Sequence, residues 1–460
     1  MNRYLAALGK IAVALLGIAA VGLLVLSPAI GSIGSIVAIV AIVLASPAAI
    51  PAANRPTAAS RSAPAVLLTV FVALGFCLVV EVMLHFVIPG TASIEMIEIN
   101  FVLLLIGPLA ALYFGWPVIR QQPAMVMFVA IFASLVVCYA ATADQWQDVL
   151  FASNFFALLL APIVYLLASG RPGARTIAIV ATLLLLGALV GALTGSFDVF
   201  VLHRERAVGW GQGGNLMART VVLLGFMALS GVFVLTSRWR WLYLLGPVLA
   251  LYTLYLTGTR GVFIAIPLLG LIVVWALMRE LRAPRIWYAV GAALVVVAIG
   301  IVGVLSPRFL GLGSVLEQVT SGSNVSDAAT SERLYMWEAG LHTFLKSPLI
   351  GSGWANFTEA AKPYGIYMFH NDLLDMAVAA GIVGIVGWIA TIAAPLVGVF
   401  VMPRDRFASL RLYCALILST SLLLFGLTDM TLGYDLPTTL HAFLTAIVLG
   451  AFREPEPRAA

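Results

Sequence analysis

The sequence is built from apolar runs of roughly 18 to 25 residues, separated by short polar connections. A helix of about 20 apolar residues crosses the hydrocarbon of a bilayer and satisfies its own backbone hydrogen bonds there. Hydrophobic residues make up 62% of the chain and charged residues only 10%, whereas a soluble domain carries charge on about a quarter of its residues. The sequence therefore predicts an all-α, polytopic membrane protein, with residues 1–460 forming a single transmembrane domain.

The apolar runs predict about twelve to fourteen transmembrane helices. Their expected bounds are 5–26, 29–50, 65–88, 98–119, 123–142, 149–169, 176–195, 216–236, 240–257, 262–278, 286–305, 371–400, 409–427 and 437–452. The first two runs, which meet near Ser27 and Pro28, are close enough to form one re-entrant pair, and the count then falls to thirteen or twelve. A cleavable signal peptide over residues 1–35 is the alternative interpretation of this start.

The basic residues indicate an orientation. Most of the 25 Lys and Arg residues fall on one side of the predicted spans, whereas nearly all acidic residues fall on the other. By the positive-inside rule the arginine-rich side, with the tail 453–460, is cytoplasmic. The net charge of +5 is explained by these anchoring arginines and does not indicate nucleic-acid binding. The three cysteines lie in separate predicted spans and indicate neither a disulfide framework nor a metal site.

Two longer loops are predicted on the opposite, non-cytoplasmic side. The loop 196–219 contains Arg204, Arg206 and a glycine-rich stretch that lacks both the order and the preceding strand of a nucleotide-binding loop. The loop 306–370 contains a segment of helical periodicity. There Trp337, Leu341 and Phe344 share one face and polar side chains share the other. We expect this amphipathic helix to lie on the bilayer surface or against the bundle.

Two arginines on the non-cytoplasmic side are candidate anion-binding residues. Arg260 follows a predicted span, and Arg333 occupies the first turn of the amphipathic helix, where the helix dipole disfavours a cation. An interfacial guanidinium is costly unless it is paired, and its planar fork suits phosphate oxygens. Two such arginines suit a pyrophosphate. Binding of lipid headgroups or of neighbouring carboxylates is the alternative.

His370 is the candidate general base, because it stands at the start of the span 371–400. Asn371 is expected to cap that helix, and a helix N-terminus favours the neutral imidazole that can accept a proton. A histidine that only packs or caps is the alternative. Asp429 is expected to be one of several solvated carboxylates at the outer rim. Because no DxD motif or cluster with metal-ligand spacing occurs, we expect no metal and no cofactor, and arginines would supply the countercharge.

Residues from about 250 to 390 resemble the O-antigen ligase and polymerase family of polytopic bacterial membrane proteins. The resemblance rests on Thr257 to Gly261, on Ser331-Glu332-Arg333 with Trp337, on Ser347 to Gly353, and on His370-Asn371 followed by Leu373, Gly381 and Gly384. It implies a GT-C type of glycosyltransferase fold in the bacterial inner membrane. It also implies transfer on the periplasmic face, from a glycan carried on undecaprenyl pyrophosphate, without metal or nucleotide.

The resemblance also implies roles for single residues. Arg260 and Arg333 take the positions that engage the lipid pyrophosphate, and His370 takes the position of the base that activates the acceptor hydroxyl. With the lipid A core as acceptor, the resemblance implies an inverting O-antigen ligase. Arg204, Arg206 and Asn371 are further candidates for contacts with substrate, although a mobile loop with solvated charges is the alternative for the two arginines.

Two other functions are weighed against the ligase. An O-antigen polymerase of the same family would join repeat units, but the spaced arginine and glycine pairs typical of polymerases do not occur here. A lipid or glycan transporter would also have many spans, yet it is expected to show charges or broken helices at mid-bilayer. Because Arg260, Arg333 and His370 are predicted at one interface, chemistry at the membrane surface is favoured. The expected partners are the lipid-linked O-antigen, the lipid A core and membrane lipids, with no nucleic acid.

Overall fold

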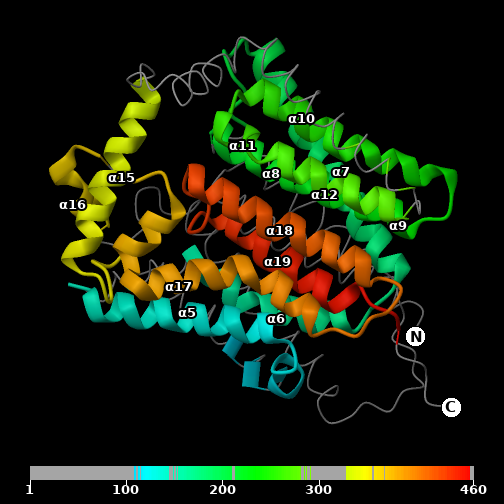
Figure 1. The fold of residues 1–460 in the computed structure, drawn as a ribbon, viewed down its shortest axis with the longest axis horizontal. Coiled ribbons are helices and arrows are strands. Elements are labelled where there is room, and N and C mark those ends of the chain that lie inside the picture. The colour runs from blue at the N-terminus through cyan, green and yellow to red at the C-terminus, as the bar shows by residue number, and fades with distance from the viewer. Residues whose placement is uncertain are drawn as a thin grey trace, which may run out of the picture.

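The computed structural model describes residues 115–144, 154–209, 213–280, 328–354, 357–366 and 368–455, together with a few isolated positions. These ranges are helical and contain no strand (Figure 1). The helices are α5 (Pro123–Thr142), α6 (Phe156–Ser169), α7 (Ala174–Ser196), η2 (Phe197–Val201), α8 (Gly214–Ala228), α9 (Ser230–Val234), η3 (Arg238–Leu244), α10 (Leu245–Thr257), α11 (Arg260–Phe263), α12 (Ile266–Glu280), α15 (Ala328–Lys346), α16 (Phe357–Ala361), η5 (Lys362–Tyr364), α17 (Asp372–Phe400), α18 (Ala408–Thr428) and α19 (Asp435–Ala451).

Six helical segments in the described part of the chain are long and apolar enough to cross a membrane. They are Pro123–Thr142, Ala174–Val201, Gly214–Val234, Arg260–Glu280, Asp372–Phe400 and Ala408–Thr428. Each coincides within a few residues with a predicted span, and the prediction of a polytopic all-α membrane protein is confirmed. The predicted spans 5–26, 29–50 and 65–88 lie outside the described residues, and those at 98–119 and 286–305 are described only in part.

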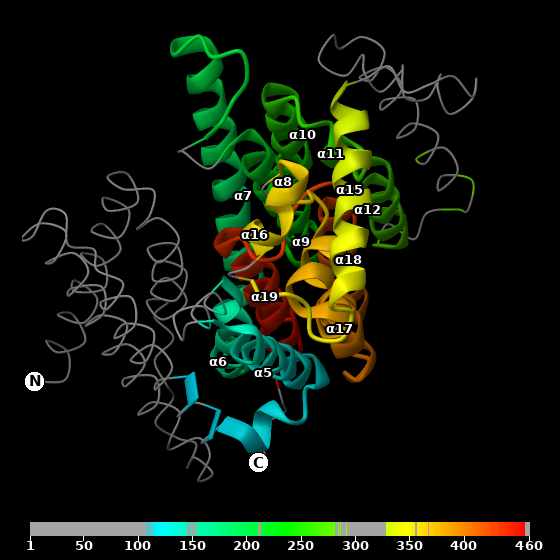
Figure 2. The same cartoon turned by 90° about the vertical axis from the view of Figure 1, so that its left-hand side faces the viewer.

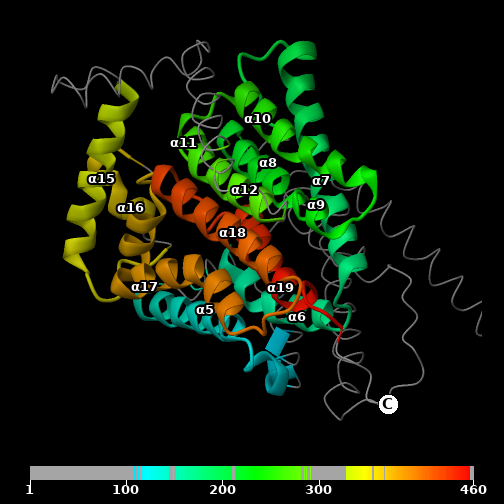
Figure 3. The ribbon, with the colours of Figure 1, turned by 45° about the vertical axis from the view of Figure 1, so that its right-hand side comes forward.

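The helices form two groups that meet along α18 and α19 (Figure 3). One group contains α7 to α12, and the other contains α5, α6 and α17 to α19. Glycines allow close approach within the first group. A Cβ atom on Gly225 of α8 would lie 2.3 Å from the carbonyl oxygen of Gly246 in α10. Small residues of this kind let membrane helices pack backbone to backbone, where lipid supplies no hydrophobic driving force.

Helix α17 is broken at Ala380 and Gly381, and the preceding loop fills the break. Gly381 has a φ of +62°, a left-handed conformation that other residues rarely adopt. The amide of Ser352 donates to the carbonyl of Val378 at 2.8 Å, and the amide of Ile382 donates to the carbonyl of Pro348 at 2.8 Å. The loop 347–353 thus satisfies backbone groups that the break leaves unpaired, as an apolar environment requires.

The predicted amphipathic helix is α15, and it packs against α17 at one end of the bundle (Figure 2). Its buried stripe consists of Met336, Ala339 and Thr343, with Trp337 and Phe344 packed beside it. Leu341, which shares the predicted apolar face with Trp337 and Phe344, is 51% exposed. The helix is rotated so that its small residues, rather than Leu341, meet the bundle, and Gly340 lies directly against the ring of Phe369.

The loop predicted at 196–219 is shorter in the structure. Helix α7 continues through the π-helical turn η2 to Val201, and α8 already begins at Gly214. Arg219 therefore lies inside a helix rather than at the end of a loop. Its side chain is buried, only 3% exposed.

Candidate functional site

His370 lies at the junction of α16, η5 and α17 in a strained conformation. Its φ of +49° is rare for a residue other than glycine. Two neighbours hold the junction in place. The side-chain oxygen of Asn371 caps α17 by accepting hydrogen bonds from the amides of Leu373 and Leu374, and the amide of Phe369 donates to Asp375 at 3.1 Å. Strain of this kind persists only where surrounding contacts over-determine it, and it is frequent at functional sites.

The imidazole of His370 is paired with Asp429, which follows α18. Their Nδ1 and Oδ1 atoms are 2.5 Å apart, and the histidine side chain is 33% exposed while that of the aspartate is 8% exposed. Asp429 accepts three further hydrogen bonds. Arg219 Nη2 lies 2.6 Å and Asn215 Nδ2 lies 2.9 Å from its Oδ2, and the amide of Met430 lies 2.9 Å from its Oδ1. Both carboxylate oxygens therefore have two donors each.

These contacts favour the ionised form of Asp429 and with it one tautomer of the neutral imidazole. Burial by itself would raise the pKa of Asp429, but the hydrogen bond from His370 and the charge of Arg219 outweigh it and hold this pKa below its ordinary value. An ionised carboxylate only accepts hydrogen bonds, so the proton of a neutral His370 imidazole lies on Nδ1. The other nitrogen, Nε2, then carries the lone pair that can accept a proton.

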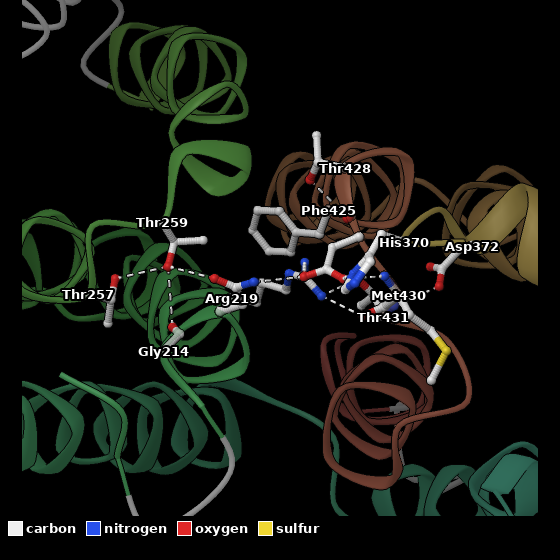
Figure 4. A network of polar contacts seen from close by, with 12 residues as sticks. Gly214, Arg219, Thr257, Thr259, His370, Asp372, Phe425, Thr428, Met430 and Thr431 are labelled. Carbon is white, nitrogen blue, oxygen red and sulfur yellow. Dashed lines mark hydrogen bonds and ion pairs between the residues drawn. The ribbon is translucent and has the colours of Figure 1, made fainter. Parts of the chain in front are cut away.

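Arg219 holds the loop that carries Asp429. Besides the ion pair, its Nη1 atom donates to the carbonyl of Met430 and to the hydroxyl of Thr431 at 3.2 Å (Figure 4). The guanidinium thus joins α8 to the turn between α18 and α19. The same turn is fixed from the other side, because Asp372 accepts hydrogen bonds from the amides of Thr431 and Leu432.

The expectation that Asp429 is solvated was wrong, because only 6% of this residue is exposed. Sequence reasoning also gave Arg219 no role of its own. A signal for both existed, since Arg219 falls near the start of one predicted span and Asp429 directly follows another. Charges at such positions are unfavourable unless they are paired. Which charge pairs with which was not visible, because the residues lie far apart in the chain.

His370 opens onto a cavity of about 430 Å³. Its lining consists of Arg206, Val208, Gly213, Gly214, Asn215, Leu216, Arg219, Met368, His370, Asp429 and Tyr434. The volume is within the range of sites for small ligands, about 300 to 1,000 Å³. The lining includes the guanidinium of Arg206 and the aromatic side chain of Tyr434, whereas Arg219 is neutralised by its ion pair with Asp429. The cavity can therefore take an anionic or polyhydroxylated group beside an imidazole.

Arg206 is positioned over the glycine-rich turn. Its Nη2 atom donates to Asn215 Oδ1 at 3.1 Å, and a Cβ atom on Gly214 would lie 2.7 Å from the same nitrogen. Glycine at this position therefore permits the arginine to lie close to the backbone. Thr259 also donates to Asn215 Oδ1, at 3.3 Å. Thr259, which belongs to the Thr257 to Gly261 motif, is thus linked through Asn215 to Asp429.

The other predicted site residues have different surroundings. Arg204 forms a 3.0 Å ion pair with Asp198, and Asn371 is buried as the helix cap and donates to the carbonyl of Leu427 at 3.2 Å. Arg260 is the exposed first residue of α11, and Arg333 is half-buried near the start of α15. None of these four lines the 430 Å³ cavity. Their assignment to substrate binding stays a prediction.

The motif from Ser347 to Gly353 and Gly381 hold the backbone rather than contribute side chains to the cavity. A Cβ atom on Gly351 would lie 2.5 Å from the amide nitrogen of Ala380, and one on Gly381 would lie 2.4 Å from the carbonyl carbon of Leu349. Among the described residues, no three His, Cys, Asp or Glu side chains form a group that could hold a metal ion.

In a comparison with protein families, residues 245–389 match the family model of O-antigen ligase. The matched segment runs from α10 to the middle of α17 and so contains Arg260, Arg333 and His370. The family resemblance predicted from the sequence is confirmed over this segment, and it indicates a glycosyltransferase-like ligase or polymerase. No curated protein sequence matches the chain.

Proposed function

From the match of residues 245–389 to the O-antigen ligase family, we propose that this protein transfers an O-antigen glycan from undecaprenyl pyrophosphate to a hydroxyl of the lipid A core. The observation that carries the proposal is the chain of contacts from Arg219 through Asp429 to His370, which ends on a cavity beside Arg206. This arrangement supplies a base and the cation Arg206 at one place, which suits glycosyl transfer from a diphosphate to a hydroxyl.

His370 is the general base of the proposed reaction. Its Nδ1–H donates to the Asp429 carboxylate, so Nε2 is the nitrogen available to the acceptor hydroxyl. The carboxylate then stabilises the imidazolium that forms when the proton is taken. General-base catalysis of this kind contributes about 10² to 10⁴ in rate. Asp429 is a positioning residue, and Arg219 acts one step further back by fixing Asp429.

The arginines are proposed to stabilise the leaving group. Arg206 lines the same cavity as His370, and its guanidinium can form charge-assisted hydrogen bonds to phosphate oxygens. Arg260 and Arg333, through the family resemblance, are proposed to engage the lipid-linked diphosphate as well. The helices that carry them, α11 and α15, lie at the end of the bundle where α18 ends (Figure 1). Positive groups near the departing pyrophosphate stabilise the charge that develops on it.

The proposed reaction is a single displacement at the anomeric carbon of the donor sugar. The acceptor oxygen forms the new glycosidic bond while its proton passes to His370 Nε2. The bond between the anomeric carbon and the pyrophosphate oxygen breaks, and undecaprenyl pyrophosphate leaves with that electron pair. Because attack occurs opposite the leaving group, the anomeric configuration inverts. The cavity faces the periplasm in this proposal, as the positive-inside rule indicates for the arginine-poor side.

Reconstitution tests the proposal. Purified protein in lipid vesicles is supplied with undecaprenyl-pyrophosphate glycan and rough lipopolysaccharide, without added metal, and the formation of smooth lipopolysaccharide is measured. We expect His370→Ala to lower turnover by about a hundredfold or more. The control is His342→Ala, because His342 is an exposed histidine of α15 whose side chain is 62% exposed. Undiminished transfer by His370→Ala would reject the role of the base.

The same vesicles distinguish the alternative functions. A polymerase would lengthen the lipid-linked glycan when the donor is supplied without lipopolysaccharide, whereas a ligase would leave it unchanged. A transporter would move the labelled donor across the bilayer and form no covalent product. Either result, in place of smooth lipopolysaccharide, would overturn the proposed ligase.

A further inference from the structure

A second, much smaller cavity lies inside the bundle behind Arg219. It has a volume of about 20 Å³ and lies between α8, α18 and α19. Most of its lining is apolar, from leucines of these helices together with Phe425 and Pro437. Its polar lining comes from Arg219, Thr220, Ser421, Thr431 and His441.

Three polar atoms at this cavity have no hydrogen-bond partner among the described residues. They are Arg219 Nε, Thr220 Oγ1 and Ser421 Oγ, and each atom is inaccessible to solvent. Arg219 is 3% exposed and Ser421 is 2% exposed. A buried donor left unpaired is costly, and most costly when it belongs to a charged group. Three such atoms around one small space therefore indicate a ligand that binds all of them.

We propose that this cavity is a binding site for a single ordered water molecule. The water accepts a hydrogen bond from Arg219 Nε and exchanges hydrogen bonds with the hydroxyls of Thr220 and Ser421. A cavity needs about 10 to 15 Å³ to hold one water molecule. The cavity of about 20 Å³ therefore has room for one water and not for two. Three partners is also the usual number for a buried water.

The charges at the site favour water over an ion. Arg219 is already neutralised by Asp429, whose carboxylate lies 2.6 Å away. A chloride beside Arg219 would therefore leave a net negative charge in an apolar interior, and a cation would face the guanidinium directly. Both arrangements carry a large desolvation cost. A neutral molecule that donates and accepts meets the needs of all three atoms.

The water completes the binding of the guanidinium. The two terminal nitrogens of Arg219 hold Asp429, the carbonyl of Met430 and the hydroxyl of Thr431. The water accepts from Nε, the one guanidinium nitrogen without a partner among the described residues, and so fixes the orientation of the whole group. Thr220 and Ser421 thereby become positioning residues that act through Arg219 on Asp429 and His370. Only this effect on turnover rests on the proposed function; the water site itself does not.

The first experiment is a high-resolution structure of the full chain in lipid nanodiscs. We expect one density peak at about 2.7 to 3.2 Å from Arg219 Nε, and its loss in the variant Ser421→Val, whose side chain fills the space. A map that resolves other buried waters but shows an empty cavity would overturn the proposal. So would a melting temperature that falls when chloride is replaced by gluconate in the wild type but not in Ser421→Val, because the occupant would then be chloride.

The second experiment measures turnover. The variant Thr220→Val/Ser421→Ala removes two partners of the water, and we expect kcat to fall about fivefold, equivalent to one lost hydrogen bond, with KM unchanged. The matched control is Thr253→Val/Ser230→Ala, which removes two buried hydroxyls that also lack partners but lie away from the cavity. Restoring one hydroxyl with Thr220→Ser/Ser421→Ala should recover part of the rate.

The two experiments fail in different ways. Equal kcat in the cavity variant and the control, with the water present in the map, would overturn the positioning role and keep the site. An inactive wild-type protein would count against the proposed function, while the density and melting temperature would still decide whether the water site exists.

Discussion

Replacing Asp429 by asparagine tests the central pair of the site. The amide has nearly the shape of the carboxylate, but it has one accepting oxygen and one donating nitrogen. In the wild type each carboxylate oxygen accepts two hydrogen bonds: Oδ2 from Arg219 and Asn215, and Oδ1 from His370 and the amide of Met430. The single oxygen of the asparagine will turn toward the charged guanidinium. Its amino group will then face His370 Nδ1.

That rotation reverses the tautomer of the imidazole. An amino group donates, so His370 Nδ1 must accept, and the ring proton moves to Nε2. A protonated Nε2 cannot remove the proton of the acceptor hydroxyl. Where an aspartate that orients a catalytic histidine is replaced by asparagine, the loss of turnover is about 10⁴-fold. We expect a loss of about 10² to 10⁴ for Asp429→Asn, since general-base catalysis itself contributes about this much.

The same change also lowers stability, and the two effects must be separated. Removing one partner of a buried ion pair costs about 3 to 5 kcal/mol, and the asparagine oxygen that still accepts from Arg219 should reduce this to about 2 to 4 kcal/mol. The matched control is Asp405→Asn. Asp405 pairs at 2.6 Å with the buried Arg411 at the opposite end of α18. It should lose stability without losing turnover.

The assay measures transfer in nanodiscs at a temperature at which both variants remain folded, and thermal unfolding is followed in the same samples. The reasoning requires Asp429→Asn to be far slower than Asp405→Asn at similar stability. Turnover of folded Asp429→Asn within about threefold of wild type would refute the assignment of the tautomer and with it the role of the carboxylate.

Three further predictions concern the break in α17, the cavity and the effect of pH. Gly381→Ala should lower the melting temperature strongly, because its Cβ atom would lie 2.4 Å from the carbonyl carbon of Leu349 at a φ of +62°; a melting curve like that of wild type would contradict this. Arg206→Ala should raise the KM for the lipid-linked donor about tenfold, as expected for one lost charge-assisted hydrogen bond, whereas the exposed, remote Arg238→Ala should not, as measured by titrating the donor. The depressed pKa of Asp429 means that its stabilisation is complete above the ordinary carboxyl pKa of about 4 and is lost as pH falls below it. The difference in melting temperature between wild type and Asp429→Asn should therefore shrink below about pH 4, and a constant difference would contradict the assigned shift.

The membrane spans could be predicted from the sequence because they depend on a local property. A run such as 123–142 or 409–427 is apolar over a length that matches the bilayer, whatever surrounds it. The same holds for Asn371, whose capping role depends on the residues next to it. The rotation of α15 was predicted only in part, because helical periodicity defines faces but does not say which face meets the bundle. Leu341 is exposed for this reason.

Only the tertiary structure decided which charges meet. Asp429 contacts His370 across 59 positions of the chain and Asn215 across 214 positions, and no local pattern encodes either distance. The same is true of the motif from Ser347 to Gly353, whose glycines make sense only against the break in α17. The sequence by itself determined where the chain enters the membrane, because the energy of insertion is a sum over neighbouring residues. The packing of the helices selected the partner of each buried charge, because that energy depends on what the fold brings within a few ångströms.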